Sequence, residues 1–487
     1  MCHGAFDVVH PGHLRHLIYA KTKADILVVS VTADKHITKG IYRPHIPEKL
    51  RALNLAVLQM VDYVLIDTAA KPLKNLKLIQ PDFFAKGFEY TSSGLPEATK
   101  EEAEFVHAYG GEMIYTPGDI VYSSTKFLDS YLPKIQIEKL LLLMKHNNIS
   151  FESLRKILNK FKKYHVHVVG DTIVDSYTRT DFIGGQTKTP TLSVLHQRQD
   201  NFIGGAGIVA QHLKAAGAQV TFSTVLGNDR LKDFVIKQLD LSGVKKQIII
   251  DSTRPTVNKN AITAGSYRLL KVDTLDNRSI SDEILKKLVK SIKSSKAKTI
   301  IFSDFRHGIF NQMSIPVLIK AISKGTFRVA DSQVASRWGN IIDFKKFDLI
   351  SPNEREARFA LADQDSTVGK LATLLQKSAK FKNLILKLGS RGIFCSSAKA
   401  NLKSSYFSVD TFATNVVDPV GAGDALLSYS TLGLLATGSL VKASILGSIA
   451  AACECEVDGN VPIKIQNILS KIDRIEKMTS YHTKLPL

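Results

Sequence analysis

The sequence predicts an α/β protein of two domains, each built around a mainly parallel sheet. The chain has 487 residues, which is more than a single hydrophobic core usually organises. Short apolar runs typical of buried strands alternate with helical stretches, and this alternation begins near residue 26 and again at residue 165. With 44% hydrophobic and 23% charged residues, the composition is that of a globular chain and excludes a disordered one.

Residues 1–133 form the first predicted domain. Its strands are expected at 26–31 and 63–66, and its helices at 14–23 and 48–61. Because strands and helices alternate, the sheet should be parallel and Rossmann-like, with ligands at the carboxyl ends of its strands.

The first strand of this domain is short. Only three residues precede Gly4, where the first strand-to-helix turn begins. A central strand of that length is too short to pair well. Two alternatives follow: the start of the chain is mis-assigned, or the domain is impaired.

A connecting helix is predicted over residues 134–163, which carry leucine and lysine at helical spacing. A larger α/β domain should follow over residues 164–487. Its expected strands lie at 165–170, 219–225, 299–302, 349–350 and 383–386. The apolar stretch 425–452 is interrupted by three glycines and Lys442, which predicts buried helices and not a membrane span.

Several sequence features indicate a cytoplasmic protein that does not contact membranes. Met1 is followed by Cys-His-Gly and not by a basic region with an apolar core, so no signal peptide is expected. The four cysteines lack metal-ligand spacing and suit reduced thiols. Nearly all of the net charge of +20 lies beyond residue 133, which suits anionic substrates. No aromatic-interleaved basic motif accompanies it, so a solvated lysine-rich surface is the simpler interpretation and nucleic acid is not an expected partner.

The turn from Gly4 to His13 is the first candidate site. It reads Gly-Ala-Phe-Asp-Val-Val-His-Pro-Gly-His and would lie at the ligand-binding edge of the first sheet. Two histidines at a helix start, His10 and His13, can stabilise the negative charge that develops on an α-phosphate under attack. Gly12 leaves room for the phosphate, and the helix N-terminus adds backbone donors. A turn with two hydrogen-bonded structural histidines is the alternative.

This whole region resembles the cytidylyltransferase-like superfamily, and in particular its sugar-phosphate adenylyltransferase branch. Further matching segments follow in order: Lys39-Gly40 with Arg43-Pro44, Pro81 to Gly87, Gly110 to Glu112, and Tyr122 to Lys126. The resemblance implies that His10 and His13 bind a nucleoside triphosphate. It assigns nucleotide or phosphate contacts to Gly4, Phe6, Gly12, Lys39, Lys86, Ser124 and Thr125. Arg51 is a weaker candidate, because a helix-surface arginine explains it equally well.

A second phosphate motif, Asp-Pro-Val-Gly-Ala-Gly-Asp, spans Asp418 to Asp424 ahead of an alanine- and leucine-rich helix. The backbone N–H groups of Gly421, Ala422 and Gly423 can form an anion hole for a transferring phosphoryl group. Asp424 would lie beside the acceptor hydroxyl and act as its general base. A glycine-rich helix cap is the structural alternative, but an acid at the last position makes the motif more specific.

Other candidates for the same site follow predicted strands or begin predicted helices. The candidates for binding sugar hydroxyls are Asp171, Asp175, Gly204 and Gly205. The candidates for magnesium and phosphate positioning, in an N-x-x-E pattern, are Asn353 and Glu356. The segment with Lys387 and Gly389 resembles a strand-turn that lines an adenine nucleotide. Each isolated carboxylate has a helix cap or a surface charge as its alternative.

Together, residues from about 150 to 487 resemble the ribokinase-like (PfkB) carbohydrate kinases. The fusion resembles the bifunctional heptose kinase/adenylyltransferases of lipopolysaccharide precursor synthesis, with the domain order reversed. The resemblance implies Mg²⁺ and ATP, a small-molecule sugar phosphate and an NTP as partners, an ADP-heptose-like product, and a homodimer. The family's glycine motif has an asparagine where this chain has Ile208, and a lost polar contact changes substrate choice.

Three other functions stay open from the sequence. One is a single-activity sugar kinase with a degenerate nucleotidyltransferase domain, which the short first strand favours. Another is a transferase acting on a non-sugar alcohol phosphate, which the kinase fusion disfavours. The third is a regulatory nucleotide-binding protein without turnover, which would require defects in both motifs.

Overall fold

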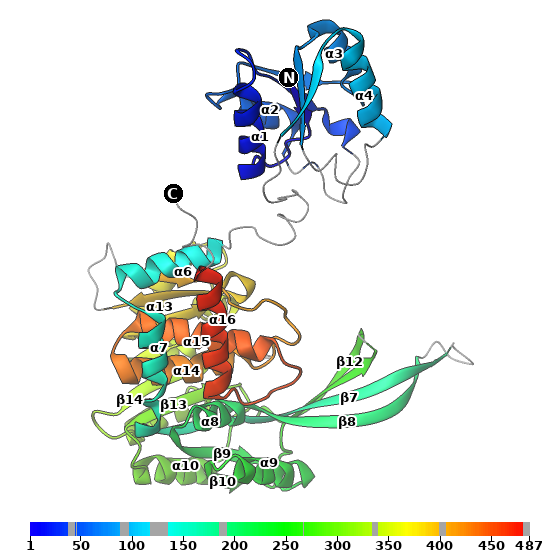
Figure 1. Cartoon of the computed structure of the whole chain (residues 1–487). Coiled ribbons are helices and arrows are strands. Elements are labelled where there is room, and N and C mark those ends of the chain that lie inside the picture. Colours follow the sequence, from blue (N-terminus) through cyan, green and yellow to red (C-terminus); the bar gives the residue numbers. More distant parts are fainter. Residues whose placement is uncertain are drawn as a thin grey trace. The chain divides into compact units, whose positions relative to one another are not determined.

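The computed structural model describes residues 1–37, 44, 46–87, 97–116, 135–184, 192–265, 267–333, 339–398 and 406–480 (Figure 1). The chain divides into two compact units, residues 1–134 and 135–487. Each unit is an α/β structure with a hydrophobic core of its own, which confirms the predicted fold class.

The smaller unit contains a five-stranded parallel sheet with the strand order β3-β2-β1-β4-β5. Its strands are β1 (Cys2–Gly4), β2 (Val28–Thr32), β3 (Tyr63–Asp67), β4 (Phe83–Gly87) and β5 (Glu112–Thr116). The central β1 has three residues, yet all three pair with β2, and Cys2 also pairs with Ala85 of β4. The Met1 ammonium donates a hydrogen bond to the Phe83 carbonyl at 2.6 Å. This pairing differs from the expectation that so short a strand pairs poorly.

The helical elements of the smaller unit are α1 (Pro11–Lys21), η1 (Asp34–His36), α2 (Glu48–Ala56), α3 (Leu73–Ile79) and α4 (Glu97–Ala108). Leu17 of α1 and Leu55 of α2 pack into a core with Val29 of β2. The α2 helix ends before residue 61, where the sequence predicted its end. Tight turns follow it, in which the Leu58 amide bonds to the Leu55 carbonyl and Val61 reaches the core.

Residues 135–163 belong to the larger unit as two helices and a short turn: α6 (Ile135–His146), α7 (Phe151–Leu158) and η3 (Phe161–Lys163). Ser150 and Ser153 form a capping box that starts α7. The apolar positions that suggested one connecting helix, Leu154 and Leu158 among them, are buried in the core of the larger unit. The segment therefore packs as part of that unit, because its apolar face has the sheet-covering helices to bury against.

The larger unit is organised by a nine-stranded sheet with the order β10-β9-β6-β13-β14-β15-β16-β17-β18. The strands are β6 (His165–Gly170), β9 (Gln219–Leu226), β10 (Lys245–Ile250), β13 (Thr299–Asp304), β14 (Phe327–Ser332), β15 (Leu349–Ile350), β16 (Asn383–Lys387), β17 (Ile393–Ser397) and β18 (Tyr406–Val409). The pairing is parallel from β10 to β16, and β17 and β18 are antiparallel. The carboxyl ends of the parallel strands therefore share one edge, where ligands bind in such sheets.

Helices cover the nine-stranded sheet (Figure 1). They are α8 (Ala206–Ala215), α9 (Arg230–Leu241), α10 (Asp282–Ser294), α11 (Ser314–Ala321), α12 (Glu354–Leu361), α13 (Val368–Ala379), α14 (Ala422–Thr437), α15 (Leu440–Cys455) and α16 (Ile465–Ser480), with the short turns η4 (Ile341–Asp343) and η5 (Gly389–Arg391). Both α14 and α15 are buried almost all round, as the sequence predicted for the stretch 425–452. Within the described residues, no helix is both long and apolar enough to cross a membrane.

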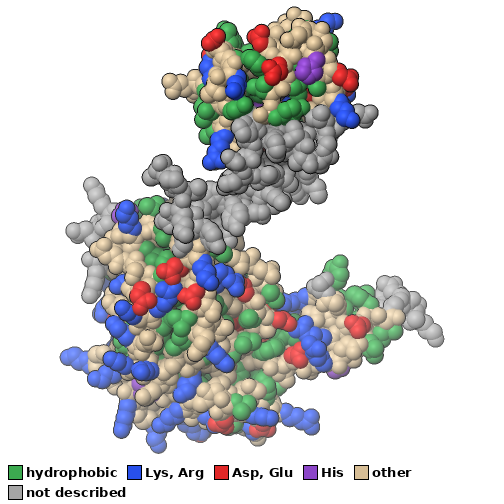
Figure 2. Space-filling model, in the orientation of Figure 1, with side chains coloured by type: hydrophobic (Ala, Val, Ile, Leu, Met, Phe, Trp, Pro, Cys, Tyr) green, Lys and Arg blue, Asp and Glu red, His purple; other side chains and the backbone are tan. Residues whose placement is uncertain are grey.

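A four-stranded sheet projects from the larger unit (Figure 1). Its strands, in the order β12-β11-β7-β8, are β7 (Thr172–Gly184), β8 (Ser193–Gly205), β11 (Asn258–Ala264) and β12 (Tyr267–Thr274). Because β7 directly follows β6, and β8 leads directly into α8, this sheet begins at the ligand-binding edge of the nine-stranded sheet. Figure 2 shows lysine and arginine side chains spread over the visible face of the larger unit.

Candidate functional site

The turn from β1 to α1 places the two predicted histidines side by side. His10 is the N-cap of α1, where its Nδ1 accepts a hydrogen bond from the Gly12 amide at 3.1 Å. Since Nδ1 is an acceptor, a neutral His10 carries its proton on Nε2. The rings of His10 and His13 stack with their centroids 3.8 Å apart. Two imidazoles and the amide end of α1 therefore meet at one place.

Gly4 and Phe6 shape this turn from within. Phe6 has a left-handed φ of +46° and is buried, and its ring lies 5.1 Å from that of His13. A Cβ atom at Gly4 would lie 3.3 Å from the Phe6 ring, which is tighter than most real Cβ contacts. Asp7 accepts a hydrogen bond from the Ile46 amide at 3.0 Å. The turn is thus held by packing and by backbone contacts.

Burial favours the neutral form of three histidines in this region, His3, His13 and His16. It lowers the pKa of His13 to about 3, and the neighbouring His10 and His16 lower it further. Burial also lowers the pKa of His3 and of His16 to about 4, with the positive charge of Lys86 acting in the same direction. A phosphate bound at this helix start would oppose these shifts, because a nearby negative charge favours the imidazolium.

Lys86, a predicted phosphate contact, lies at the end of β4 in an ion pair with Glu102 of α4. Its Nζ is 2.6 Å from the Glu102 carboxylate, and both side chains are less than a tenth exposed. The other three predicted contacts to phosphate, namely Lys39, Ser124 and Thr125, lie outside the described residues.

Arg51 is fully buried, which corrects the alternative of a helix-surface arginine. Its guanidinium donates to the carbonyls of Ile46 and Thr32 at 2.8 Å each, and it also bonds to the Ala5 carbonyl. An ion pair with Asp34 at 2.6 Å compensates its charge. The side chain therefore ties together the backbone beneath the histidine turn, where burial without such partners would be costly.

In the larger unit, a cavity of about 800 Å³ is lined by both sheets and by the segments that follow β13, β14, β15 and β16. It brings together most of the predicted kinase residues, which are Asp175, Gly205, Asn353, Glu356, Lys387, Gly389, Gly421, Ala422, Gly423 and Asp424. Asp171, Gly204 and Ile208 are not among its lining residues. A single space therefore contains both the glycine turn and a carboxylate predicted to bind hydroxyls.

The glycine turn forms the start of α14. Gly421 is the N-cap with a left-handed φ of +86°, and Asp424 lies in the first helical turn. Burial raises the pKa of Asp424 well above its ordinary value, and the negative charge of Asp331 adds to the shift while Lys387 opposes it. A poised carboxylate next to backbone donors is the arrangement that a general base and an anion hole require.

Lys387 supplies positive charge to this part of the cavity. Its Nζ lies 2.8 Å from the Asp331 carboxylate, and a Cβ atom at Gly423 would lie 3.4 Å from the same Nζ. Burial opposes the charge of the ammonium, but Asp331 and Glu356 outweigh it, so the pKa of Lys387 is raised. The lysine therefore stays protonated beside the glycine turn.

Asn353 and Glu356 form the capping box of α12. The Glu356 carboxylate accepts from the Asn353 amide and from its Nδ2, both at 2.6 Å, and the Asn353 Oδ1 accepts from the Glu356 amide at 2.8 Å. Burial raises the pKa of Glu356 to about 8, although Lys387 opposes this. The side-chain oxygens of these two residues are ligands that a hard divalent ion prefers. Because they already accept hydrogen bonds in the capping box, they suit an ion that keeps its own water ligands.

Asp171 and Asp175 have different surroundings. The buried Asp171 carboxylate accepts from the amides of Phe305, His307 and Ile309 at 3.0, 3.2 and 3.4 Å, so it organises the segment after β13. Asp175 lines the cavity. Burial raises the pKa of Asp175 to about 6, with Lys259 and Lys271 opposing the shift.

Gly204 and Gly205 are required by close approach and by backbone conformation. A Cβ atom at Gly204 would lie less than 3.0 Å from the Asp175 carboxylate, closer than real Cβ atoms come. Gly205 has a φ of +60° and starts α8. Both glycines thus allow β8 to pass directly beside the carboxylate.

Several cavity residues were not predicted from the sequence. The four-stranded sheet contributes Tyr177, Lys259, Arg268 and Lys271, and the loop after α15 contributes Asn460. Lys259 is the one basic residue of β11, and Arg268 and Lys271 of β12 lie three positions apart, which in a regular strand would place them on opposite faces, so no alternating pattern gave a usable signal. Asn460 follows no motif and gave none.

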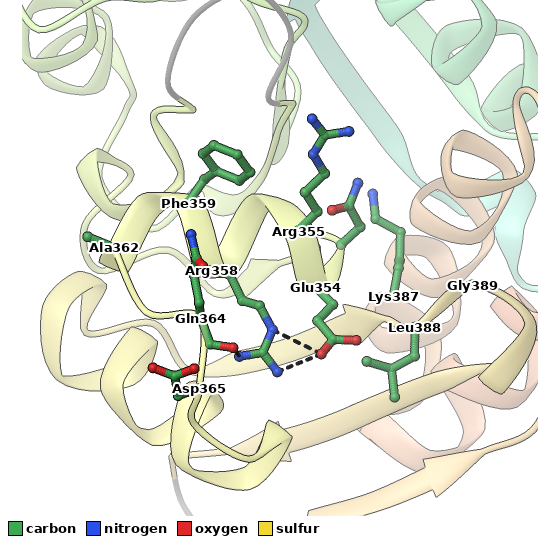
Figure 3. A pocket seen from close by; sticks show the side chains of 11 residues that line it. Glu354, Arg355, Arg358, Phe359, Ala362, Gln364, Asp365, Lys387, Leu388 and Gly389 are labelled. Carbon is green, nitrogen blue, oxygen red and sulfur yellow. Dashed lines mark hydrogen bonds and ion pairs between the residues drawn. The ribbon is translucent and has the colours of Figure 1, made fainter.

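A second cavity, of about 880 Å³, adjoins the strand-turn at Lys387 to Gly389 (Figure 3). Asn353, Lys387 and Gly389 line both cavities. Figure 3 shows Arg355 of α12 and Lys387 pointing to the same side of this pocket. Glu354 accepts from Arg358 at 2.7 Å and fixes the wall that α12 provides.

Two family models match the chain. The model described as pfkB family carbohydrate kinase matches residues 163–464, and the cytidylyltransferase-like model matches residues 1–130. Among similar proteins, the "Bifunctional protein HldE" of Pelobacter propionicus is 25% identical over 312 residues, which cover 62% of this chain and 61% of that protein. The protein of the same name from Campylobacter jejuni subsp. doylei is 27% identical over 336 residues, covering 67% and 69%.

Solved structures similar to this chain share the fold of its larger unit. Phosphofructokinase-2 from Escherichia coli, in complex with substrates and products, superposes with a TM-score of 0.54 at 16% identity, covering 64% of this chain and 99% of that one. Arabidopsis thaliana ribokinase, complexed with ribose and ATP, gives a TM-score of 0.51 at 18% identity, covering 63% and 98%.

Proposed function

Because this chain belongs to the pfkB family of carbohydrate kinases and also carries a cytidylyltransferase-like domain, we propose that it catalyses two consecutive steps. The larger unit phosphorylates a sugar phosphate with ATP, at the anomeric hydroxyl. The smaller unit then joins the resulting sugar 1-phosphate to a nucleoside monophosphate taken from an NTP. The product is a nucleotide-activated sugar of the ADP-heptose type, made in the cytoplasm, where ATP and sugar phosphates are available.

In the kinase step, Asp424 accepts the proton of the acceptor hydroxyl. At the same time, the oxygen of that hydroxyl forms a bond to the γ-phosphorus of ATP. The bond from that phosphorus to the β-phosphate bridging oxygen breaks, and ADP leaves. Gly421, Gly423 and Lys387 line the cavity beside Asp424, so the two glycine amides and the Lys387 ammonium can stabilise the charge of the transferring group. Asp175 orients the acceptor by accepting hydrogen bonds from its hydroxyls.

Three cations of the four-stranded sheet support a phosphorylated acceptor. Lys259 of β11 and Arg268 and Lys271 of β12 line the same cavity as Asp175 and Asp424. Burial and the charge of Lys271 lower the pKa of Lys259, with Asp175 opposing this, as expected of cations that face one another without a bound anion. A phosphate on the sugar, away from the reacting hydroxyl, would form ion pairs with these three side chains and compensate their positive charge.

The second cavity is where we place the nucleoside of ATP, since it shares Asn353, Lys387 and Gly389 with the first. Glu356 and Asn353 would hold Mg²⁺ through its waters, and the ion would neutralise charge on the ATP phosphates.

In the transferase step, an oxygen of the sugar 1-phosphate attacks the α-phosphorus of the NTP and pyrophosphate leaves. His10 and His13 at the start of α1 stabilise the charge that builds on the α-phosphate. Neither step requires a covalent enzyme intermediate. The short β1 does not prevent this assignment, because it pairs with both neighbours and supports the turn.

The observation that carries the proposal is the cavity in which Asp424, the glycine turn and Asp175 meet, in a chain that also contains the paired histidines. The test is an assay of purified protein with Mg²⁺, ATP and a panel of free and phosphorylated hexoses and heptoses. ADP and pyrophosphate are followed separately. Release of both from one sugar phosphate is the expected result. ADP without pyrophosphate, even when authentic sugar 1-phosphates and each NTP are supplied, would reduce the function to a sugar kinase.

A further inference from the structure

The loop between α15 and α16 enters the kinase cavity and brings Asn460 into it. Asn460 is only 5% exposed, yet it lines the cavity together with Asp175 and Gly421. No motif or proposed step has used this residue. A buried amide at this position must form specific contacts, because a buried polar group without partners is costly.

One side of the Asn460 amide holds the acceptor-binding carboxylate. Its Nδ2 donates to Asp175 Oδ2 at 2.7 Å. This orientation of the amide is required, since the opposite one would place the amide oxygen against a carboxylate oxygen. Gly204 on β8 passes so close that a Cβ atom there would meet both the Asp175 carboxylate and the Asn460 nitrogen. The carboxylate is therefore confined between β8 and the loop.

The other side of the amide lies against the phosphoryl-binding turn. A Cβ atom at Gly421 would lie less than 3.0 Å from the Asn460 Oδ1. That oxygen is buried and has no hydrogen-bond partner among the described residues. Asn460 therefore contacts, through its two ends, the carboxylate on the acceptor side and the glycine turn on the phosphoryl side.

The loop that carries Asn460 is itself held at several points. Glu454, the penultimate residue of α15, accepts from the Val461 amide at 3.2 Å. A Cβ atom at Gly459 would lie less than 3.0 Å from the Phe202 ring of β8. Arg179 of β7 donates to Asp458 at 2.5 Å. These contacts place the loop on the four-stranded sheet and on α15, so Asn460 has little freedom to move.

We infer that Asn460 is a positioning residue of the kinase site, which fixes the acceptor-binding carboxylate of Asp175 relative to the phosphoryl-binding turn at Gly421. The inference rests on the proposed kinase function. Asn460 would contribute to the reaction through geometry alone, because a small displacement of one reactant from the other strongly lowers the rate. The amide joins the two halves of the site without contacting the reacting atoms.

The test compares kinetic constants of Asn460→Asp with those of the wild-type protein, using ATP, Mg²⁺ and the sugar phosphate found active in the panel assay. The substitution keeps the size of the side chain but sets a carboxylate against Asp175. We expect the KM for the sugar phosphate to rise by about 10- to 100-fold, as for a lost charge-assisted hydrogen bond, while the KM for ATP stays unchanged. Lys464→Ala, an exposed position on the same loop, should leave both constants unchanged.

A double-mutant cycle separates positioning from folding. Asp175→Asn alone weakens acceptor binding, because it removes the acceptor-binding carboxylate, so the effect of Asn460→Asp is measured in both backgrounds. If Asn460 acts by holding Asp175, adding Asn460→Asp to Asp175→Asn should raise the KM for the sugar phosphate much less than it does in the wild-type protein. An unchanged KM in Asn460→Asp, or an equal rise in both backgrounds, overturns the inference and leaves the kinase proposal in place. If the wild-type protein phosphorylates no sugar in the panel, the kinase proposal itself fails.

Discussion

At the scale of single residues, Asp424 is the group on which the kinase step depends most directly. Asp424→Asn keeps the shape of the side chain and removes its ability to take a proton. Phosphoryl transfer should fall by at least about 100-fold, because a positioned general base contributes roughly 10²- to 10⁴-fold. The affinity for ATP, measured by calorimetry, should persist. Asp282→Asn, an exposed acid in the first turn of α10, is the matched control. Undiminished turnover in Asp424→Asn would remove the base assignment.

Glu454 provides a test of stability against pH, because it is completely buried. Burial raises its pKa to about 8, so the folded protein retains a proton that the unfolded chain releases near pH 4.5. Stability that depends on this group is therefore present at low pH and is lost as the pH rises from about 4.5 to about 8. Glu454→Gln keeps an oxygen that can accept from the Val461 amide, but it has no proton to lose. The free energy of unfolding of the variant should therefore fall less between pH 5 and pH 9 than that of the wild-type protein, by about 2–5 kcal/mol. Urea unfolding of both proteins at pH 5 and pH 9 measures it, and equal slopes with pH would contradict it.

Some site residues could be predicted from the sequence and others could not. Gly421 and Asp424 were predictable because the motif that contains them is contiguous, and its spacing alone sets a turn before a helix. Asn460 was not, because its partner Asp175 is 285 positions away and only packing brings the two together. Asp171 and Asp175 are the same residue type four positions apart, yet one binds backbone amides and the other lines the cavity. Nothing in their local sequence distinguishes these surroundings.

At the scale of elements, the role of the glycine at the start of α14 can be tested by comparison with the glycine at the end of the same helix. Gly421 at the start and Gly438 at the end both have a left-handed φ, of +86° and +65°. A Cβ atom at Gly438 would meet nothing within 4 Å, whereas one at Gly421 would collide with Asn460 and approach Glu454. Gly421→Ala should therefore lower kcat by about 100-fold or more, since it displaces the anion hole.

Gly438→Ala is the control for backbone strain alone. It should cost about 1–2 kcal/mol in unfolding free energy, because alanine disfavours this conformation, and it should leave kcat unchanged. Steady-state kinetics together with denaturant unfolding of the two variants distinguishes the effects. Equal losses of kcat in both would mean that strain, and not the crowding at Gly421, explains the result.

Elements were easier to predict than their ends. The strands β6 and β15 have the predicted bounds, because each centres on buried apolar residues, the valines of β6 and Leu349-Ile350 of β15, next to polar or glycine residues. The α2 helix ended early and 134–163 became two helices, since tertiary packing decides where an apolar face stops. The four-stranded sheet was not predicted. Its outer strands, such as β12, are mostly exposed and lack the apolar signal of a buried strand.

At the scale of the whole molecule, the two proposed activities belong to two units with separate cores, so each should survive loss of the other. His10→Ala should reduce pyrophosphate release by about 100-fold or more and spare ADP formation, because His10 stabilises charge only in the transferase step. Asp424→Asn should do the reverse when sugar 1-phosphate is supplied. Loss of both activities in either variant would indicate a folding defect.

Mixing the two variants then asks how the intermediate passes from one step to the next. A sugar 1-phosphate is small and highly charged, and nothing in either proposed step binds it covalently, so it should diffuse through solvent between chains. The mixture of His10→Ala and Asp424→Asn proteins should therefore form the nucleotide sugar after a lag, at a rate that rises with the concentration of either protein. Each variant alone should form almost none. A mixture that stays inactive, although each variant retains its one activity, would require direct transfer within a single chain, and the fusion would then serve more than the local supply of intermediate.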